Sequence, residues 1–103
     1  MIKLPKTVTI LSHEYQIVRV PQEEIDDNYG IVKFEEQTIY LADHLNGDFL
    51  RETLLHEVLH IIDYYTAGAN NQVKERDIHR LSHVLFDTLR KNPALIKRVF
   101  RIH

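Results

Sequence analysis

The stretch TLLHEVLHIID, from Thr53 to Asp63, carries two histidines and a glutamate within a run that is otherwise almost wholly apolar. His56 and His60 are four residues apart, so on a helix their Cβ atoms lie about 40° apart around the axis, one turn above the other. Two imidazoles placed in this way can bind one metal ion. Glu57 lies about 60° from His60, close enough to hydrogen-bond a water molecule on that ion. This is the HExxH arrangement, in which one helix carries two metal ligands and a general base.

The alternative is an ordinary buried helix in which these three residues coincide by chance. The neighbouring side chains are apolar enough to bury one side of the motif: Leu54, Leu55, Val58, Leu59, Ile61 and Ile62. Two imidazoles and a carboxylate on so apolar a helix are costly to bury without partners, and a metal ion would satisfy them. The surroundings therefore favour a metal site.

Helical periodicity extends the motif in both directions. A helix is predicted from Asp48, as N-cap, to Gly68, as C-terminal cap. A second helix is predicted from Gln72 to Lys91, and a short third helix starts at Pro93. The apolar stripe predicted for the first helix is Leu55, Val58, Leu59, Ile62 and Tyr65.

The first 42 residues follow a strand pattern instead. Residues 7–10 and 14–20 are rich in β-branched and aromatic side chains and predict one hairpin, and residues 30–34 and 37–42 predict a second. The acidic segment between them, residues 22–28, is predicted to be a surface loop or a short helical turn. The chain is thus predicted to be α+β, with a small, mostly antiparallel sheet of three or four strands followed by two long helices and a short C-terminal helix.

Composition limits the classes of protein that remain. With 103 residues, residues 1–103 are expected to form a single domain. A net charge of −2 gives no indication of nucleic-acid binding, and no apolar run approaches the length of a membrane span, so we expect a cytoplasmic protein without a membrane partner. Because cysteine is absent, any metal must be held by imidazole and carboxylate groups. The sequence does not indicate an oligomeric state.

A catalytic zinc site needs a third protein ligand, which the second helix can supply. His79 is the preferred candidate because it lies beside the apolar stripe of that helix. The small side chain of Ser82, on the same row, would let the two helices approach closely. Glu75 and His83 remain open as alternatives, followed by Asp77.

Other polar residues have two interpretations each. Asp63 could accept a hydrogen bond from a ligand imidazole and fix its tautomer, or it could be a surface carboxylate. The tyrosines 40, 64 and 65 could donate to a developing oxyanion, although a core or interface position is the more ordinary role. Three histidines have no partner visible in the sequence and are expected at the surface: His13, His44 and His103.

The run Thr53–Asp63, the segment DIHRLSHVLFDTLRKNP from Asp77 to Pro93 and the preceding QTIYLADHL resemble the minimal zincin domains of bacteriophages and prophages. These domains are related to the ImmA/IrrE-type metallopeptidases. The resemblance implies a zincin-like fold with one zinc ion, with His56 and His60 as ligands and Glu57 as base. It places the third ligand on His79, where that family usually has glutamate.

The resemblance implies zinc-dependent hydrolysis of a peptide or protein substrate. Zinc would activate water and polarise the scissile carbonyl, and Glu57 would move the proton. The strand at residues 37–42 could pair with an extended substrate if it lies at an open sheet edge. Two alternatives remain: a hydrolase of another kind, and a phage-type regulatory or interaction protein that binds metal without turnover.

Overall fold

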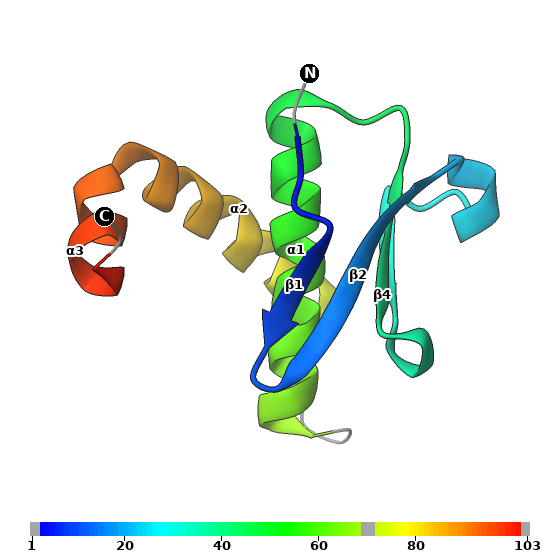
Figure 1. Ribbon diagram of the computed structural model, residues 1–103, viewed down its shortest axis with the longest axis horizontal. Coiled ribbons are helices and arrows are strands. Elements are labelled where there is room, and N and C mark those ends of the chain that lie inside the picture. Colours follow the sequence, from blue (N-terminus) through cyan, green and yellow to red (C-terminus); the bar gives the residue numbers. More distant parts are fainter. Residues whose placement is uncertain (1–2, 69–71, 102–103) are drawn as a thin grey trace.

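A computed structural model describes residues 3–68 and 72–101 and confirms the α+β class (Figure 1). Within these residues a four-stranded sheet precedes three helices. The strands are β1 (Thr7–Ile10), β2 (His13–Val20), β3 (Gly30–Lys33) and β4 (Thr38–Ala42). The helices are α1 (Gly47–Ala67), α2 (Glu75–Lys91) and α3 (Pro93–Phe100), with short 3-10 turns η1 (Gln22–Ile25) and η2 (Phe34–Glu36). Each strand boundary lies within one residue of its predicted position.

The sheet has the order β1-β2-β4-β3 and is mixed. Both predicted hairpins are antiparallel, and the parallel pairing of β2 with β4, which places Ile17 opposite Ile39, joins them. β4 is therefore an inner strand with a partner on each side. The prediction that residues 37–42 offer an open edge to a substrate is wrong, because chain order does not reveal sheet order. The edges of the sheet are β1 and β3.

The core lies between the sheet and α1. Its fully buried side chains include Tyr15, Ile39, Leu41, Leu50 and Ile61, each at most 1% exposed. The sheet-facing side of α1 is lined by Leu50, Leu54, Val58, Ile61 and Tyr65. The predicted stripe was thus partly wrong, and Ile62 is 40% exposed. Since α1 carries apolar residues around much of its circumference, periodicity alone does not select the face that meets the sheet.

The helix starts also differ from prediction. α1 begins at Gly47 with Asn46 as its N-cap residue, and the carboxylate of Asp48 pairs with Arg51 and Arg90. α2 begins at Glu75, three residues after its predicted start at Gln72.

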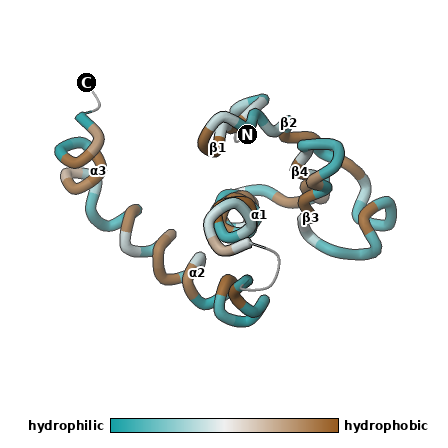
Figure 2. Tube along the Cα trace, turned by 90° about the horizontal axis from the view of Figure 1, so that it is seen from below, coloured by the Kyte–Doolittle hydropathy of each residue, from teal (hydrophilic) through white to brown (hydrophobic). Residues whose placement is uncertain are grey.

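The two long helices pack antiparallel. His83 of α2 pairs with Glu52 of α1, and Arg90 pairs with Asp48 near the start of α1. Viewed along α1, that helix lies between the sheet and α2, and α3 lies at the far end of α2, away from β3 (Figure 2). In the described part of the chain, no helix has the length and apolarity that a membrane crossing needs.

Neighbouring isoleucines on α1 test this packing. Ile61→Ala should lower the free energy of unfolding by about 2 to 5 kcal/mol, because it leaves a cavity in the core. Ile62→Ala, at a 40% exposed position, should change it by less than about 1 kcal/mol. Urea denaturation of both variants measures the difference. Equal losses would contradict the orientation of α1.

Candidate metal centre

Three side chains from two helices converge on one point. The Nε2 atom of His56 lies 2.7 Å from Oε1 of Glu75, and Nε2 of His60 lies 2.7 Å from Oε2 of the same carboxylate. The two Nε2 atoms are 3.1 Å apart, and the potential ligand atoms of the three residues all lie within 4.8 Å of one another. The group therefore presents nitrogen and oxygen lone pairs to a common centre.

This donor set fits a cation such as zinc. Imidazole nitrogens and carboxylate oxygens repel one another at these distances unless a proton or a metal ion lies between them. Two histidines and a glutamate are a ligand set found in catalytic zinc sites. The Glu75 side chain is 69% exposed, so the centre is accessible from solvent on that side.

Glu75, rather than the predicted His79, meets the two imidazoles. The ring of His79 lies one turn further along α2, with its centroid 5.9 Å from that of His56. α2 begins at Glu75 and crosses α1 there, so its first turn lies opposite the two histidines. His83, the other alternative, is held by Glu52 at 2.6 Å, away from this group.

Ser82 orients His56. The Ser82 hydroxyl is 3.0 Å from the carbonyl oxygen of His79, to which it donates, and 3.3 Å from Nδ1 of His56. Its oxygen can therefore accept a hydrogen bond from Nδ1–H, which leaves the lone pair of Nε2 free for the centre. Ser82 is only 1% exposed, which agrees with the prediction that a small residue lets the helices approach.

Asp63 positions the start of α2. Both carboxylate oxygens accept the backbone N–H of Val73, at 3.2 and 3.1 Å. This contact ties the last turns of α1 to the chain two residues before Glu75. Within residues 3–68 and 72–101, Asp63 has no hydrogen bond to His56 or His60, so its connection to the group runs through the backbone of Val73.

Glu57 is buried next to the convergent group. Glu57 is only 6% exposed. This burial, together with the negative charge of the Glu75 carboxylate, raises the pKa of Glu57 to about 8. Burial also lowers the pKa of His56, and it outweighs the opposite effect of Glu75. A neutral imidazole is the form that binds metal, so this environment favours ligation.

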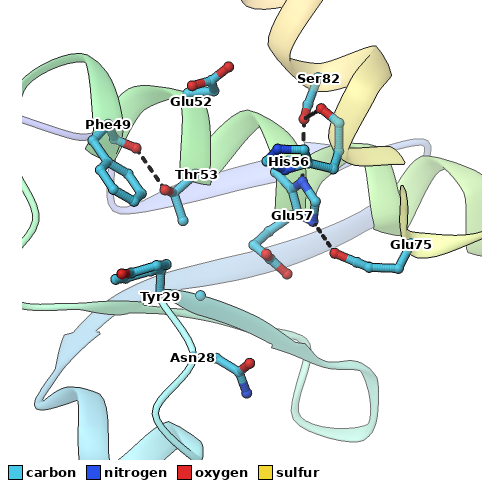
Figure 3. Close-up of a pocket in the computed structure, with 11 residues that line it drawn as sticks. Asn28, Tyr29, Phe49, Glu52, Thr53, His56, Glu57, Glu75 and Ser82 are labelled. Carbon is cyan, nitrogen blue, oxygen red and sulfur yellow. Dashed lines mark hydrogen bonds and ion pairs between the residues drawn. The ribbon is translucent and has the colours of Figure 1, made fainter. Parts of the chain in front are cut away.

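A cleft of about 280 Å³ opens beside these groups, between α1, α2 and the start of β3. Its lining includes His56, Glu57 and His79, and Figure 3 shows Glu57 pointing into it, above Asn28 and level with Tyr29. Gly30 permits this approach. A Cβ atom there would lie 3.1 Å from a methyl carbon of Thr53 and 3.3 Å from Cγ of Glu57.

The tyrosines considered as oxyanion donors serve other contacts. The hydroxyl of Tyr65 lies 2.7 Å from that of Tyr15 in the core. Tyr64 stacks on Phe34 at a centroid distance of 4.2 Å, and Tyr40 donates to Glu36. None of the three lines the cleft.

The remaining histidines have separate positions. His44 is exposed, as predicted, and hydrogen-bonds to Gln22. His13 is half-buried and stacks on Tyr65 with ring centroids 4.1 Å apart, so its prediction as a surface residue was wrong. His103 lies outside the described residues.

Among the cleft residues that were missed in the sequence are the aromatic residues Phe49 and Tyr29. Phe49 lies seven positions before His56, a helical spacing that places both on one face of α1 and could have identified it. Tyr29 gives no comparable signal, because its place in the cleft depends on how β3 packs against α1.

Comparisons of the chain with protein-family models, curated proteins and solved structures found no match. The resemblance to phage zincins therefore stays a prediction.

The raised pKa of Glu57 predicts how stability depends on pH. In metal-free protein the folded state keeps this proton up to about pH 8, whereas the unfolded chain loses it near pH 4.5. The stability that the protonated Glu57 contributes is therefore fully present below pH 4.5 and is lost as the pH rises to 8. The loss in the free energy of unfolding is at most about 5 kcal/mol. Glu57→Gln removes this dependence, so the variant should gain stability relative to the parent between pH 5 and 8.

Denaturant unfolding with a chelator present measures this difference. Glu24→Gln, which replaces an exposed carboxylate on η1, serves as the control. The difference in unfolding free energy between this variant and the parent should change little with pH. A constant difference between parent and Glu57→Gln would show that the carboxyl is not buried as described.

Proposed function

We propose that this chain is a zinc-dependent hydrolase that cleaves peptide bonds, with His56, His60 and Glu75 as metal ligands and Glu57 as general base. The observation that carries the proposal is the convergence of two Nε2 atoms and one carboxylate within 4.8 Å, beside a buried second carboxylate. A structural zinc site uses four protein ligands, whereas three leave a coordination position for chemistry. The cleft beside the group gives a substrate access to that position.

A zinc ion bound there supplies a Lewis acid that lowers the pKa of water and polarises a carbonyl group. Glu57 supplies proton transfer: it accepts a proton from the attacking water and delivers it to the leaving amine. The Glu57 carboxyl lies buried beside the ligand group, where a bound cation would lower its pKa and favour the ionised form that accepts a proton. Ser82 keeps His56 in the tautomer that offers Nε2, and Asp63 keeps Glu75 beside it.

The edge strand β3 is the proposed backbone-binding element. The amide of Ala42 donates to the carbonyl of Tyr29 at 2.8 Å, and the register continues with Ile31 opposite Tyr40 and Val32 opposite Ile39. Because bonded and non-bonded pairs alternate in an antiparallel ladder, the backbone groups of Val32 point away from β4. An extended substrate could pair with them while it passes the cleft at Gly30.

Metal binding tests the ligand set. Glu75→Ala should weaken zinc binding by at least about a hundredfold, because it removes one of three ligands. His79→Ala should change the affinity by less than about threefold. Competition with a chromophoric chelator gives both affinities. If His79→Ala weakened zinc binding more than Glu75→Ala, His79 would be the third ligand.

Turnover tests the role of Glu57. Glu57→Gln should still bind zinc but should hydrolyse peptides about 10² to 10⁴ times more slowly. A peptide library analysed by mass spectrometry measures cleavage, with Glu24→Gln as a matched control on the surface. If the parent binds zinc and cleaves nothing, the chain is a metal-binding protein without turnover.

Val32→Pro tests the edge strand. Proline removes the outward N–H of β3 and is tolerated at an edge, so the variant should fold and bind zinc while KM for peptides rises. Val32→Ala keeps the N–H and should leave KM nearly unchanged. Equal KM values for the two variants would show that the substrate does not pair with β3.

A further inference from the structure

Two aromatic rings stand exposed at the end of the cleft nearest the start of α1. Tyr29 is 49% exposed and Phe49 is 51% exposed, and their ring centroids lie 4.9 Å apart with the planes inclined by 64°. Both line the same cleft as His56 and Glu57. Figure 3 shows the two rings next to each other, on the opposite side of Thr53 from His56.

The two rings lie close to the place where the scissile bond of a substrate would bind. Phe49, Thr53 and His56 follow at spacings of four and three residues, so they form one row along α1. Tyr29 directly precedes Gly30, where an added Cβ atom would lie 3.3 Å from Cγ of Glu57. A substrate backbone beside Gly30 would therefore carry a side chain onto these rings one or two residues from the bond that Glu57 serves.

The chemistry of this end of the cleft is apolar with one anionic group. Glu52 is the charged residue that lines it there, and its carboxylate is held by His83 at 2.6 Å. Exposed aromatic pairs gain contact area and edge-to-face energy when a further ring packs on them. A carboxylate side chain would lose hydration on these rings without a compensating contact, which disfavours it.

We infer that Tyr29 and Phe49 form a specificity subsite that selects substrates with an aromatic or bulky apolar side chain next to the scissile bond. The inference rests on the proposed function, because it assigns the substrate class of that same site. The cleft of about 280 Å³ suits one large side chain with its backbone. The two residues determine selectivity and take no part in the bond-making step.

Binding of hydroxamates to the zinc-loaded protein tests the subsite without requiring turnover. Two series are needed, with the variable side chain on the amino or on the carboxyl side of the chelating group. Each series carries Phe, Leu, Ala or Glu at that position. In one of the two series, the hydroxamate with the Phe side chain should bind at least about tenfold more tightly than the one with Ala. The hydroxamate with Glu should bind most weakly.

The variants locate this preference. Tyr29→Ala and Phe49→Ala should each reduce the Phe-to-Ala ratio to less than about threefold, whereas Tyr29→Phe should retain it. Tyr64→Ala removes a 37% exposed tyrosine outside the cleft and should not change the ratio. Circular dichroism and zinc affinity check that each variant is folded and loaded.

The outcomes separate the two proposals. If the parent binds zinc and hydroxamates but shows no side-chain preference in either series, the subsite is wrong and the metal site stands. If both Tyr29→Ala and Phe49→Ala keep the preference for the Phe side chain, the subsite is also wrong. If the parent binds no zinc, the proposed function fails and this inference fails with it.

Discussion

The contact between Ser82 and His56 sets the crossing of the two helices on which the site depends. Ser82 is 1% exposed and its hydroxyl lies 3.3 Å from Nδ1 of His56, so a larger side chain would push α2 away from α1. Glu75 precedes Ser82 by about two turns on the same helix. Its distance from His56 and His60 is therefore fixed by this crossing and by the anchoring of Val73 on Asp63.

The local elements of the fold were predictable because short-range patterns specify them. Alternation gave the four strands, and Pro93 marked the start of α3 at the observed residue. The order of the strands was not predictable in the same way, since the parallel pairing of β2 with β4 joins two complete hairpins across the sequence. For α1, apolar residues on several faces concealed which side meets the sheet.

The same division applies to the site. His56, Glu57 and His60 were identified from spacing on one helix, and the second helix was expected to supply the third ligand, with His79 preferred and Glu75 as an alternative. The choice of Glu75 over His79 depends on where α2 begins and how it crosses α1. No periodicity contains that information. Tyr29 was missed for a related reason, because it enters the cleft through long-range packing of β3.

The convergence of Glu75 on two imidazoles links the folding of the chain to its ionic surroundings. His56 and His60 are one turn apart in any helical state, whereas Glu75 follows His60 by fifteen positions and joins them only in the folded chain. A cation held by all three would close this loop as a cross-link and would bind the unfolded chain far less well. By mass action, each tenfold rise in free cation above the dissociation constant would then stabilise the fold by about 1.4 kcal/mol. The packing of α2 on α1 would thus respond to metal supply as well as to the sequence.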